Sequence, residues 1–330
     1  MSHAMTRRDA LLATLALAAG CAGTDVGARA GAWPSTHVRI IVGGAAGSVP
    51  DALARIAADA LAARLGQPVI IDDRPGAGGI LAMDRLIHSE PDGYTIALAT
   101  VSQAVFNPYL FATLPYDPRR DLVPIAKLVA TSFVLAANPS LGADSLAQVV
   151  ALSQREPDRL LIGVPANGSP PHIAAILLLQ KTGLKAKFVP FRSGPDALSS
   201  AIRGDIHLLV DGPTLIAPQV KDRKLEALAV TGPERQDALA DVPTLAEADF
   251  KDAECESWMG LFAPRGTPPE IIARINRESR AILESAAYLG KLKALSFLPQ
   301  STSPEEFAAF IGAEHARWSD VLRSSGLKLE

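Results

Sequence analysis

Residues 41–51 constrain the fold of this chain more than any other stretch, because small residues there separate an apolar run from a helical pattern. The apolar run, 38–42, is typical of a buried parallel strand. Ser48 and Asp51 have the Ser-x-x-Asp spacing of a helix capping box. The amides of Gly47 and Ser48 would then face a cleft at a helix N-terminus, which favours a phosphate or carboxylate. A tight turn without a ligand is the alternative.

Length and composition indicate a folded protein with more than one domain. The chain has 330 residues, enough for two domains of ordinary size. Hydrophobic residues make up 48% and charged residues 20%, which is the balance of a globular protein. The net charge is −3 and no basic tract occurs, so we expect no nucleic-acid partner.

The first residues have the pattern of an export signal, which we assign to 1–32. A pair of arginines precedes the apolar run 10–19, which is too short to span a bilayer. General export and twin-arginine export both fit this pattern. We favour cleavage after an A-x-A site, which starts the mature, periplasmic chain at Trp33. A lipobox-like sequence that ends at Cys21, and would make the protein a lipoprotein, is the alternative.

Common enzyme signatures are missing from the sequence. It contains no G-x-G-x-x-G, no Gly-Lys-Ser/Thr loop, no G-x-S-x-G and no H-E-x-x-H. After cleavage Cys255 would be the only thiol, and it is predicted to be a buried core residue rather than a nucleophile. A nucleotide-dependent oxidoreductase is the best enzyme alternative, because Asp72 ends the second predicted strand, where an acid would hold a ribose.

Strand and helix patterns alternate along the chain and predict an α/β fold with two domains. A helix over 52–65, a strand at 68–71, a helix over 80–89 and a strand at 94–100 indicate a parallel sheet with right-handed crossovers. The β-rich run 121–138 is predicted to cross into a second domain. The elements predicted after it are a helix near 144–155, strands at 160–164, 186–189, 206–210, 225–230 and 256–263, and helices from Ser169, over 268–285 and over 304–324.

Two crossings between the domains predict a hinge. The predicted domain 1 consists of 33–131 and 257–330, and domain 2 of 132–256. A second strand-to-helix turn, 165–172, repeats the first in kind, with Ser169 as helix N-cap and prolines in the first turn. Ligands of open α/β sheets bind at the carboxyl ends of the strands, where both turns lie.

Several segments, in order along the chain, carry a resemblance to one family. They are 41–51, 74–79 (RPGAGG), 91–95 (PDGYT), 168–172 (GSPPH), 189–194 (VPFRSG), 241–248 (DVPTLAEA), 263–268 (APRGTP) and 326–330 (GLKLE). From residue 33 to its end the chain resembles the Bug family, the extracytoplasmic solute receptors of tripartite tricarboxylate transporters. The resemblance implies a two-domain periplasmic-binding-protein fold, each domain a mostly parallel sheet flanked by helices, with two crossing strands.

The resemblance also implies a function. Such a receptor closes on a small carboxylate, whether a mono- or dicarboxylate, an aromatic acid or an amino acid, without metal, cofactor or reaction. It hands the ligand to the membrane subunits of a transporter; presentation to a membrane sensor kinase is the alternative. The family's binding residues correspond here to Ala46, Gly47, Ser48, Asp51, Thr100, Ser102, Gly168, Ser169, His172 and Asp211.

The two aspartates in this set have more than one interpretation, and so does one arginine that is also a candidate binding residue. Asp51 would repel an anion, so closing the capping box suits it better than ligand contact, unless the ligand has an amino group. Asp211 would either orient loop amides or accept a hydrogen bond from the ligand. Arg192, on a loop after a strand, is either a solvated side chain or the partner of a second ligand carboxylate.

The chain departs from the family pattern in its first loop. The family usually has an aromatic residue in place of Gly44, a glycine in place of Ser48 and a small hydroxyl residue in place of Pro50. We expect Gly44 to enlarge the pocket or to leave its space to Phe106 or Phe191. These changes leave the identity of the carboxylate open.

Overall fold

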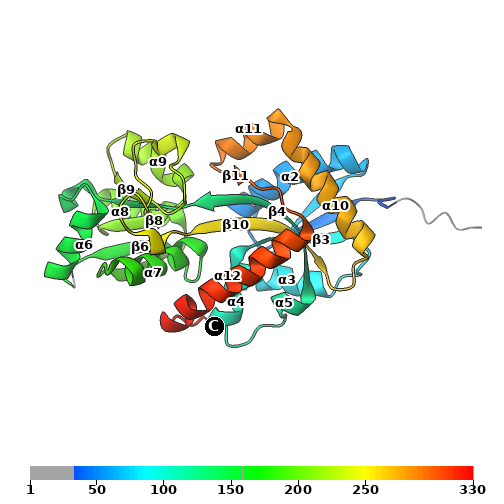
Figure 1. The fold of residues 1–330 in the computed structure, drawn as a ribbon, viewed down its shortest axis with the longest axis horizontal. Helices are drawn as coiled ribbons and strands as arrows, with labels where there is room; N and C mark the ends of the chain where they lie inside the picture. The colour runs from blue at the N-terminus through cyan, green and yellow to red at the C-terminus, as the bar shows by residue number, and fades with distance from the viewer. Residues whose placement is uncertain (1–32, 158, 330) are drawn as a thin grey trace, which may run out of the picture. The chain divides into compact units, whose positions relative to one another are not determined.

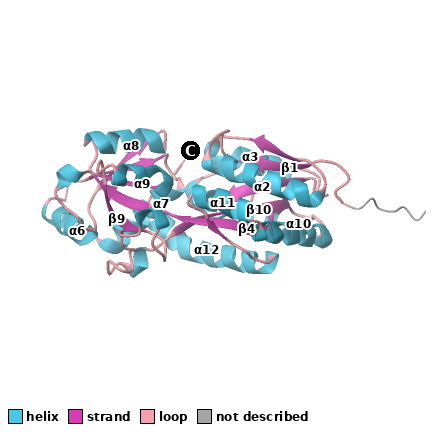
Figure 2. Ribbon diagram, turned by 90° about the horizontal axis from the view of Figure 1, so that it is seen from above, coloured by secondary structure: helices cyan, strands magenta, loops and turns pink. Residues whose placement is uncertain are grey.

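The computed structural model describes residues 33–157 and 159–329. The predicted export signal, 1–32, and with it Cys21, lies outside the described residues. Of these, residues 36–157 and 159–329 belong to one compact unit. This unit contains two β-sheets with helices packed around them (Figure 1 and Figure 2).

The first sheet has six strands in the order β11-β4-β10-β3-β1-β2. β1 pairs in parallel with β2 and β3, whereas β10 runs antiparallel between β3 and β4. Its strands are β1 (Val38–Val42), β2 (Val69–Asp73), β3 (Thr95–Thr100), β4 (Leu122–Ser132), β10 (Glu256–Pro264) and β11 (Leu298–Pro299). The run 38–42 is thus a strand, as its apolar pattern predicted.

The second sheet has five strands in the order β7-β6-β8-β5-β9. β6 pairs in parallel with β7 and β8, and β5 runs antiparallel to β8 and β9. Its strands are β5 (Val134–Ala137), β6 (Leu161–Pro165), β7 (Lys187–Phe191), β8 (Leu208–Asp211) and β9 (Glu226–Val230). The α/β fold with two helix-flanked sheets agrees with the predicted fold class.

The chain crosses between the sheets twice, as the sequence predicted. It passes from β4 to β5 at Phe133, and it returns into β10 after Cys255, whose amide donates to Thr231 O at 2.8 Å. The two long crossing strands lie side by side, with Glu256 opposite Ser132 (Figure 1). Each sheet is mixed, and not mostly parallel as expected, because β10 pairs antiparallel with β3 and β4 in the first sheet and β5 pairs antiparallel with β8 and β9 in the second. The domain boundaries proposed from the sequence stay a prediction.

Helices cover the sheets, and the first of them directly follows the first loop. α2 packs on β1 and β2, while α10 and α12 pack on β4. The helices are α2 (Val49–Leu65), α3 (Ile80–Ile87), α4 (Asn107–Leu110), α5 (Pro118–Asp121), α6 (Leu146–Arg155), α7 (Pro170–Thr182), α8 (Gly194–Arg203), α9 (Pro213–Lys221), α10 (Pro269–Ala281), α11 (Ala286–Ala294) and α12 (Pro304–Ser324). The single helix predicted over 268–285 is wrong in its length, because α10 ends at Ala281 and Ser285 caps α11 by accepting from Tyr288 N. Within the described residues no helix has both the length and the apolar character needed to cross a bilayer.

Cys255 is a core residue, as predicted. It is 3% exposed and free of a disulfide in the described part of the chain. Burial raises the pKa of its thiol to about 12, so the side chain stays neutral at physiological pH. A neutral buried thiol is a poor nucleophile.

Candidate functional site

The first strand-to-helix loop joins the end of β1 to α2. Gly47 adopts φ +81°, a left-handed conformation that glycine takes at little cost. Ser48 is the N-cap of α2, but its Oγ makes no hydrogen bond, so the predicted capping box does not form. A Cβ added at Gly44 would overlap Ser48 Oγ. The glycine at 44 is therefore what allows a serine at 48.

The aromatic residues expected to fill the space at Gly44 do not do so. Phe106 packs edge-on against Trp318 with ring centroids 5.1 Å apart, and Phe191 lies beside Gly163. The space next to Gly44 is taken by the hydroxyl of Ser48 instead. The alternative in which Phe106 or Phe191 fills this space is therefore wrong, whereas Gly44 itself lines the cavity described below.

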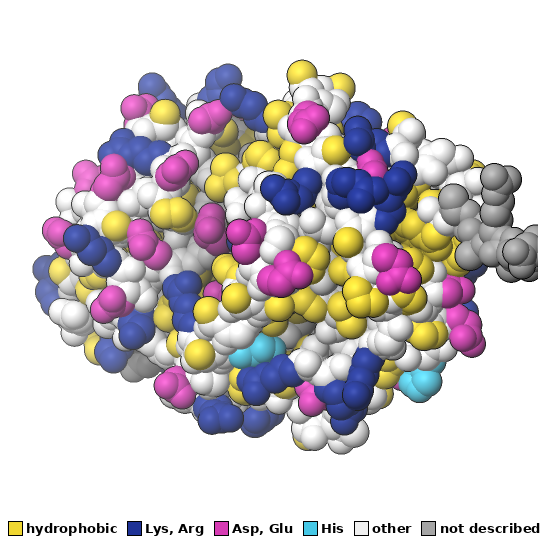
Figure 3. All heavy atoms as spheres, turned by 45° about the vertical axis from the view of Figure 1, so that its right-hand side comes forward, with side chains coloured by type: hydrophobic (Ala, Val, Ile, Leu, Met, Phe, Trp, Pro, Cys, Tyr) yellow, Lys and Arg dark blue, Asp and Glu magenta, His cyan; other side chains and the backbone are white. Residues whose placement is uncertain are grey.

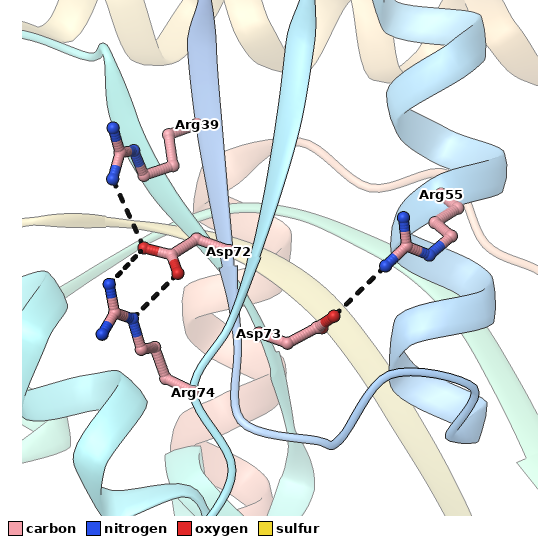
Figure 4. A network of polar contacts seen from close by, with 5 residues as sticks. All are labelled: Arg39, Arg55, Asp72, Asp73 and Arg74. Atoms are coloured by element: carbon pink, nitrogen blue, oxygen red, sulfur yellow. Dashed lines mark hydrogen bonds and ion pairs between the residues drawn. The ribbon is translucent and has the colours of Figure 1, made fainter.

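Asp51 holds the first loop together from within. Its Oδ2 accepts a hydrogen bond from Gly47 N at 2.7 Å, and its Oδ1 lies 2.8 Å from Arg55 Nε. Arg55 also pairs with Asp73 at 3.2 Å (Figure 4). Burial opposes ionisation of Asp51, but the contacts with Arg55 and the Gly47 amide lower the pKa of this carboxyl overall. The Gly47 amide, predicted to be a ligand donor, is thus already bonded to Asp51.

The second predicted donor of this loop is bonded as well. The amide of Ser48 donates to Ala45 O at 3.0 Å and closes a tight turn. The amide of Val49, at the first position of α2, makes no hydrogen bond within the described part of the chain, and Val49 lines the cavity described below. The backbone amide that remains free at the N-terminus of α2 is therefore that of Val49, one residue after the Ser48 amide that the sequence indicated.

The second strand-to-helix loop, after β6, is braced by His172. Ser169 caps α7: its Oγ accepts from His172 N at 3.4 Å and donates to Pro165 O. His172 Nδ1 accepts from Gly168 N at 3.1 Å, and its ring packs edge-on against Phe188 with centroids 5.0 Å apart. Burial lowers the pKa of His172 to about 4, so the ring is neutral and can serve as an acceptor.

Acid should destabilise this loop through His172. Because its folded pKa lies below the ordinary 6.5, protonation favours the unfolded chain, and stability is lost as the pH falls from about 6.5 towards 4. We expect up to about 3 kcal/mol of unfolding free energy to depend on this group. In a His172→Asn variant the amide oxygen can still accept from Gly168 but does not titrate, so urea unfolding between these pH values should show a shallower slope. The exposed His88→Asn serves as control, and an equal slope in all three proteins would contradict this role.

Both loops face one cavity of about 800 Å³, which we call the central cavity. Its size lies within the usual range for small-molecule sites, about 300–1,000 Å³. The predicted residues that line it are Gly47, Ser48, Thr100, Ser102, Gly168, Ser169 and Asp211. Ala46, Asp51, His172 and Arg192 do not line it. The sequence therefore located the two loops and some of their residues that face the cavity, and ligand binding by these residues stays a prediction.

The four predicted residues outside the lining have other positions. Asp51 and His172 support the two loops from behind, with 2% and 3% exposure. Ala46 and Arg192 are exposed on the surface. Arg192 is thus not placed to hold a second carboxylate in this conformation.

Asp211 is the only ionisable side chain among the described residues that line the central cavity. It ends β8, and its Oδ1 accepts from Gly212 N at 2.7 Å. Within the part of the chain that the structure describes, its Oδ2 is buried without a partner, and it packs against Gly194, where a Cβ would lie 2.5 Å away. Burial raises the pKa of Asp211 to about 6, and the Gly212 amide opposes part of this rise.

The outer surface differs from the lining of the cavity, because cationic and anionic side chains are interspersed over the face shown in Figure 3.

Three polar atoms of the cavity residues are buried without a hydrogen-bond partner in the described part of the chain. They are Ser48 Oγ, Ser102 Oγ and Asp211 Oδ2. An unpaired buried polar atom costs about 1–3 kcal/mol, and such atoms are rare in folded proteins. All three belong to residues that line one cavity, so a polar ligand or water is expected to be bound next to them.

Sequence reasoning missed the side chain that organises the end of β3. Gln103 Oε1 accepts from Thr100 N at 2.8 Å and from Thr100 Oγ1 at 2.7 Å, while its Nε2 donates to Gly78 O at 2.8 Å. Gln103 thereby ties the third strand to the glycine-rich turn. Gln103 directly follows Ser102, a predicted site residue, but no family motif or spacing rule singled it out.

The apolar part of the wall was also missed. It includes Phe111, Phe133, Met259, Phe297 and Leu329, which come from widely separated segments. Leu329 is held there because its amide donates to Leu110 O at 2.9 Å. No local pattern marks such residues, because each looks like an ordinary core position.

Asp72, the acid on which the oxidoreductase alternative rested, has other partners. Its carboxylate pairs with Arg74 Nε at 2.8 Å and with Arg39 at 3.4 Å (Figure 4). Asp72 does not line the central cavity. The residue therefore lacks the position that a ribose-binding acid would need.

Comparisons with known proteins agree with this geometry. The model of the family described as "Tripartite tricarboxylate transporter family receptor" matches residues 53–327. Protein BugT of Bordetella pertussis is 30% identical over 327 residues, which cover 99% of this chain and 99% of BugT. The structure of R. palustris Rpa4515 with adipate is similar with a TM-score of 0.79 and 32% identity, covering 89% of this chain and 98% of that one.

A further solved structure is similar at nearly the same level. MatC from Rhodopseudomonas palustris with bound malate has a TM-score of 0.76 and 30% identity, covering 88% of this chain and all of that one. The periplasmic binding protein BugD, at 24% identity and a TM-score of 0.76, shares the fold. The resemblance found in the sequence is therefore confirmed, and the chain belongs to the tripartite tricarboxylate transporter receptor family, the solute-binding Bug proteins.

Proposed function

We propose that the protein is a periplasmic receptor that captures a small carboxylate in the central cavity for a tripartite tricarboxylate transporter. The observation that carries the proposal is the single cavity onto which both strand-to-helix loops open. The bound adipate and malate of two related receptors support the ligand class. No bond is made or broken; the receptor only binds, and the transporter's membrane subunits receive the ligand.

The carboxylate would be held by neutral donors. The lining has no lysine, arginine or histidine among the described residues, but it has the Val49 amide and the hydroxyls of Ser48 and Ser102. Charge-assisted hydrogen bonds of this kind contribute about 1.5–3 kcal/mol each. Three or four of them, less the entropy of binding and closure, leave an affinity near the micromolar range.

Asp211 narrows the ligand class. A dianionic ligand would bring its charge next to a buried carboxylate without any cation to compensate it. A ligand with an ammonium or hydroxyl group beside its carboxylate would instead donate to the unpaired Oδ2. We therefore propose an amino or hydroxy acid as the preferred ligand, with its donor group at Asp211.

A melting screen tests the receptor function directly. The mature protein should gain thermal stability with one class of acid, because a ligand that binds only the folded state raises the melting temperature by mass action. The screen compares amino acids, hydroxy acids, aliphatic diacids and aromatic acids, with NAD as the control for an oxidoreductase. Stabilisation by NAD and by none of the acids would refute the proposed receptor function.

A further inference from the structure

A second cavity, of about 580 Å³, lies between one face of α12 and the segment 104–124. We call it the α12 cavity. Its lining shares no residue with that of the central cavity. The family comparisons and the proposed function leave it without a role.

The α12 cavity exists because one stripe of the helix carries small side chains. Ala308, Gly312 and Ala316 recur at a spacing of four residues, and a Cβ added at Gly312 would meet nothing within 4 Å. Part of the wall is apolar and includes Phe262 and Ile311. The cavity therefore has room for the apolar body of a small molecule.

One side of this cavity is a linked set of hydrogen-bonding groups. Arg119 donates to Tyr109 Oη at 2.8 Å, and this oxygen lies 3.3 Å from His315 Nδ1. His315 is 4% exposed and lines the cavity. The guanidinium of Arg323 lies over the Tyr109 ring, 5.6 Å from its centroid.

The charged side chains that line this side are cationic. No aspartate or glutamate lines the α12 cavity, and in the described residues neither Arg119 nor Arg323 forms an ion pair with a carboxylate. The nearby acids are engaged otherwise: Asp117 accepts from the Arg119 amide, and Asp121 pairs with Arg120 at 2.7 Å. Arginines that line a pocket without acidic partners are suited to a carboxylate, which they can bind through two parallel hydrogen bonds.

We propose that the α12 cavity is a second binding site, which takes a small organic carboxylate with an apolar body. The carboxylate lies between Arg119 and Arg323, and the apolar body lies along Gly312 against Phe262 and Ile311. The site is independent of the central cavity. It therefore gives the receptor a position at which an acid other than the transported ligand can bind.

Fluorine NMR with para-fluorophenylacetate as the probe tests this assignment. The wild-type protein should shift or broaden the probe signal in a saturable way. Gly312→Leu fills the cavity and should abolish that effect. Gly290→Leu is the matched control, because Gly290 also lies in a helix, α11, with nothing within 4 Å of an added Cβ. Both changes raise helix propensity, so both variants should stay folded.

The charge of the site is tested separately. Arg119→Gln and Arg323→Gln should each weaken the probe about tenfold, the loss expected for one charge-assisted hydrogen bond. The neutral analogue para-fluorophenylacetamide lacks the carboxylate. Its affinity for the wild-type protein should be no higher than the affinity of the two arginine variants for para-fluorophenylacetate. With the central cavity saturated by the acid found in the melting screen, a saturable effect that persists in Gly312→Leu, or no saturable effect in wild type, would overturn the proposal. Binding of the acid found in the melting screen should be unchanged in all four variants.

Discussion

Replacing Asp211 by Asn should reverse the ligand preference of the central cavity. At pH 8 the wild-type carboxylate is ionised, since burial raises its pKa only to about 6. It should then favour a ligand that carries an ammonium over the matching diacid. In Asp211→Asn the ratio of affinities for L-glutamate and glutarate should fall at least about tenfold, because one charge-assisted hydrogen bond is lost and one repulsion is removed. Isothermal titration calorimetry with the two ligands measures this ratio.

The pH profile gives the same prediction a second, independent readout. As the pH falls through about 6, Asp211 becomes neutral, so wild-type affinity for glutarate should rise while affinity for glutamate should fall. The Asn variant should show neither change. An affinity ratio that stays constant in the variant and across pH would remove Asp211 from the site while leaving the receptor function intact.

Replacing Glu314 by Leu should lower the free energy of unfolding strongly. Glu314 is 7% exposed, and its Oε2 accepts from Trp258 Nε1 at 3.0 Å and from Trp318 Nε1 at 3.1 Å. The carboxylate thereby ties α12 to the crossing strand β10. Leucine would leave two buried indole N–H groups unpaired at about 1–3 kcal/mol each. We expect the free energy of unfolding to drop by about 2–6 kcal/mol in urea or guanidinium denaturation.

A matched variant separates the hydrogen bonds from the packing. In Glu314→Gln the side chain retains one oxygen that can accept from both indoles, because both contacts go to the same carboxylate oxygen. This variant should lose less than half as much stability as Glu314→Leu. Equal losses in the two variants would show that the carboxylate charge, and not the acceptor atom, supports the fold.

The secondary-structure elements that flank the two loops of the site could be predicted from the sequence. The apolar run 38–42, the glycines after it and the amphipathic pattern of α2 are local signals, and β1 and α2 follow them. The second loop, with Ser169 as N-cap, was predicted in the same way. Short-range sterics and hydrogen bonding decide such features, so a single sequence carries them.

Other parts of the fold have no strong local signal. The turn of helix after β3 and the short helices α4 and α5 were missed, because polar and aromatic residues without a clear period fill this segment. The end of α10 was misplaced for a related reason, since its last turn continues smoothly into a short 3-10 segment before Ser285.

The sequence alone determined the fold class, the family and the two loops that face the central cavity. Only the tertiary structure decided which groups are available there. Gly47 has the right place in the chain but donates to Asp51, and Gly44 lies against Ser48 Oγ at the cavity wall. Leu329 reaches the wall from the other end of the chain. A hydrogen bond or a cavity wall depends on which distant atoms meet, and a local pattern does not contain that information.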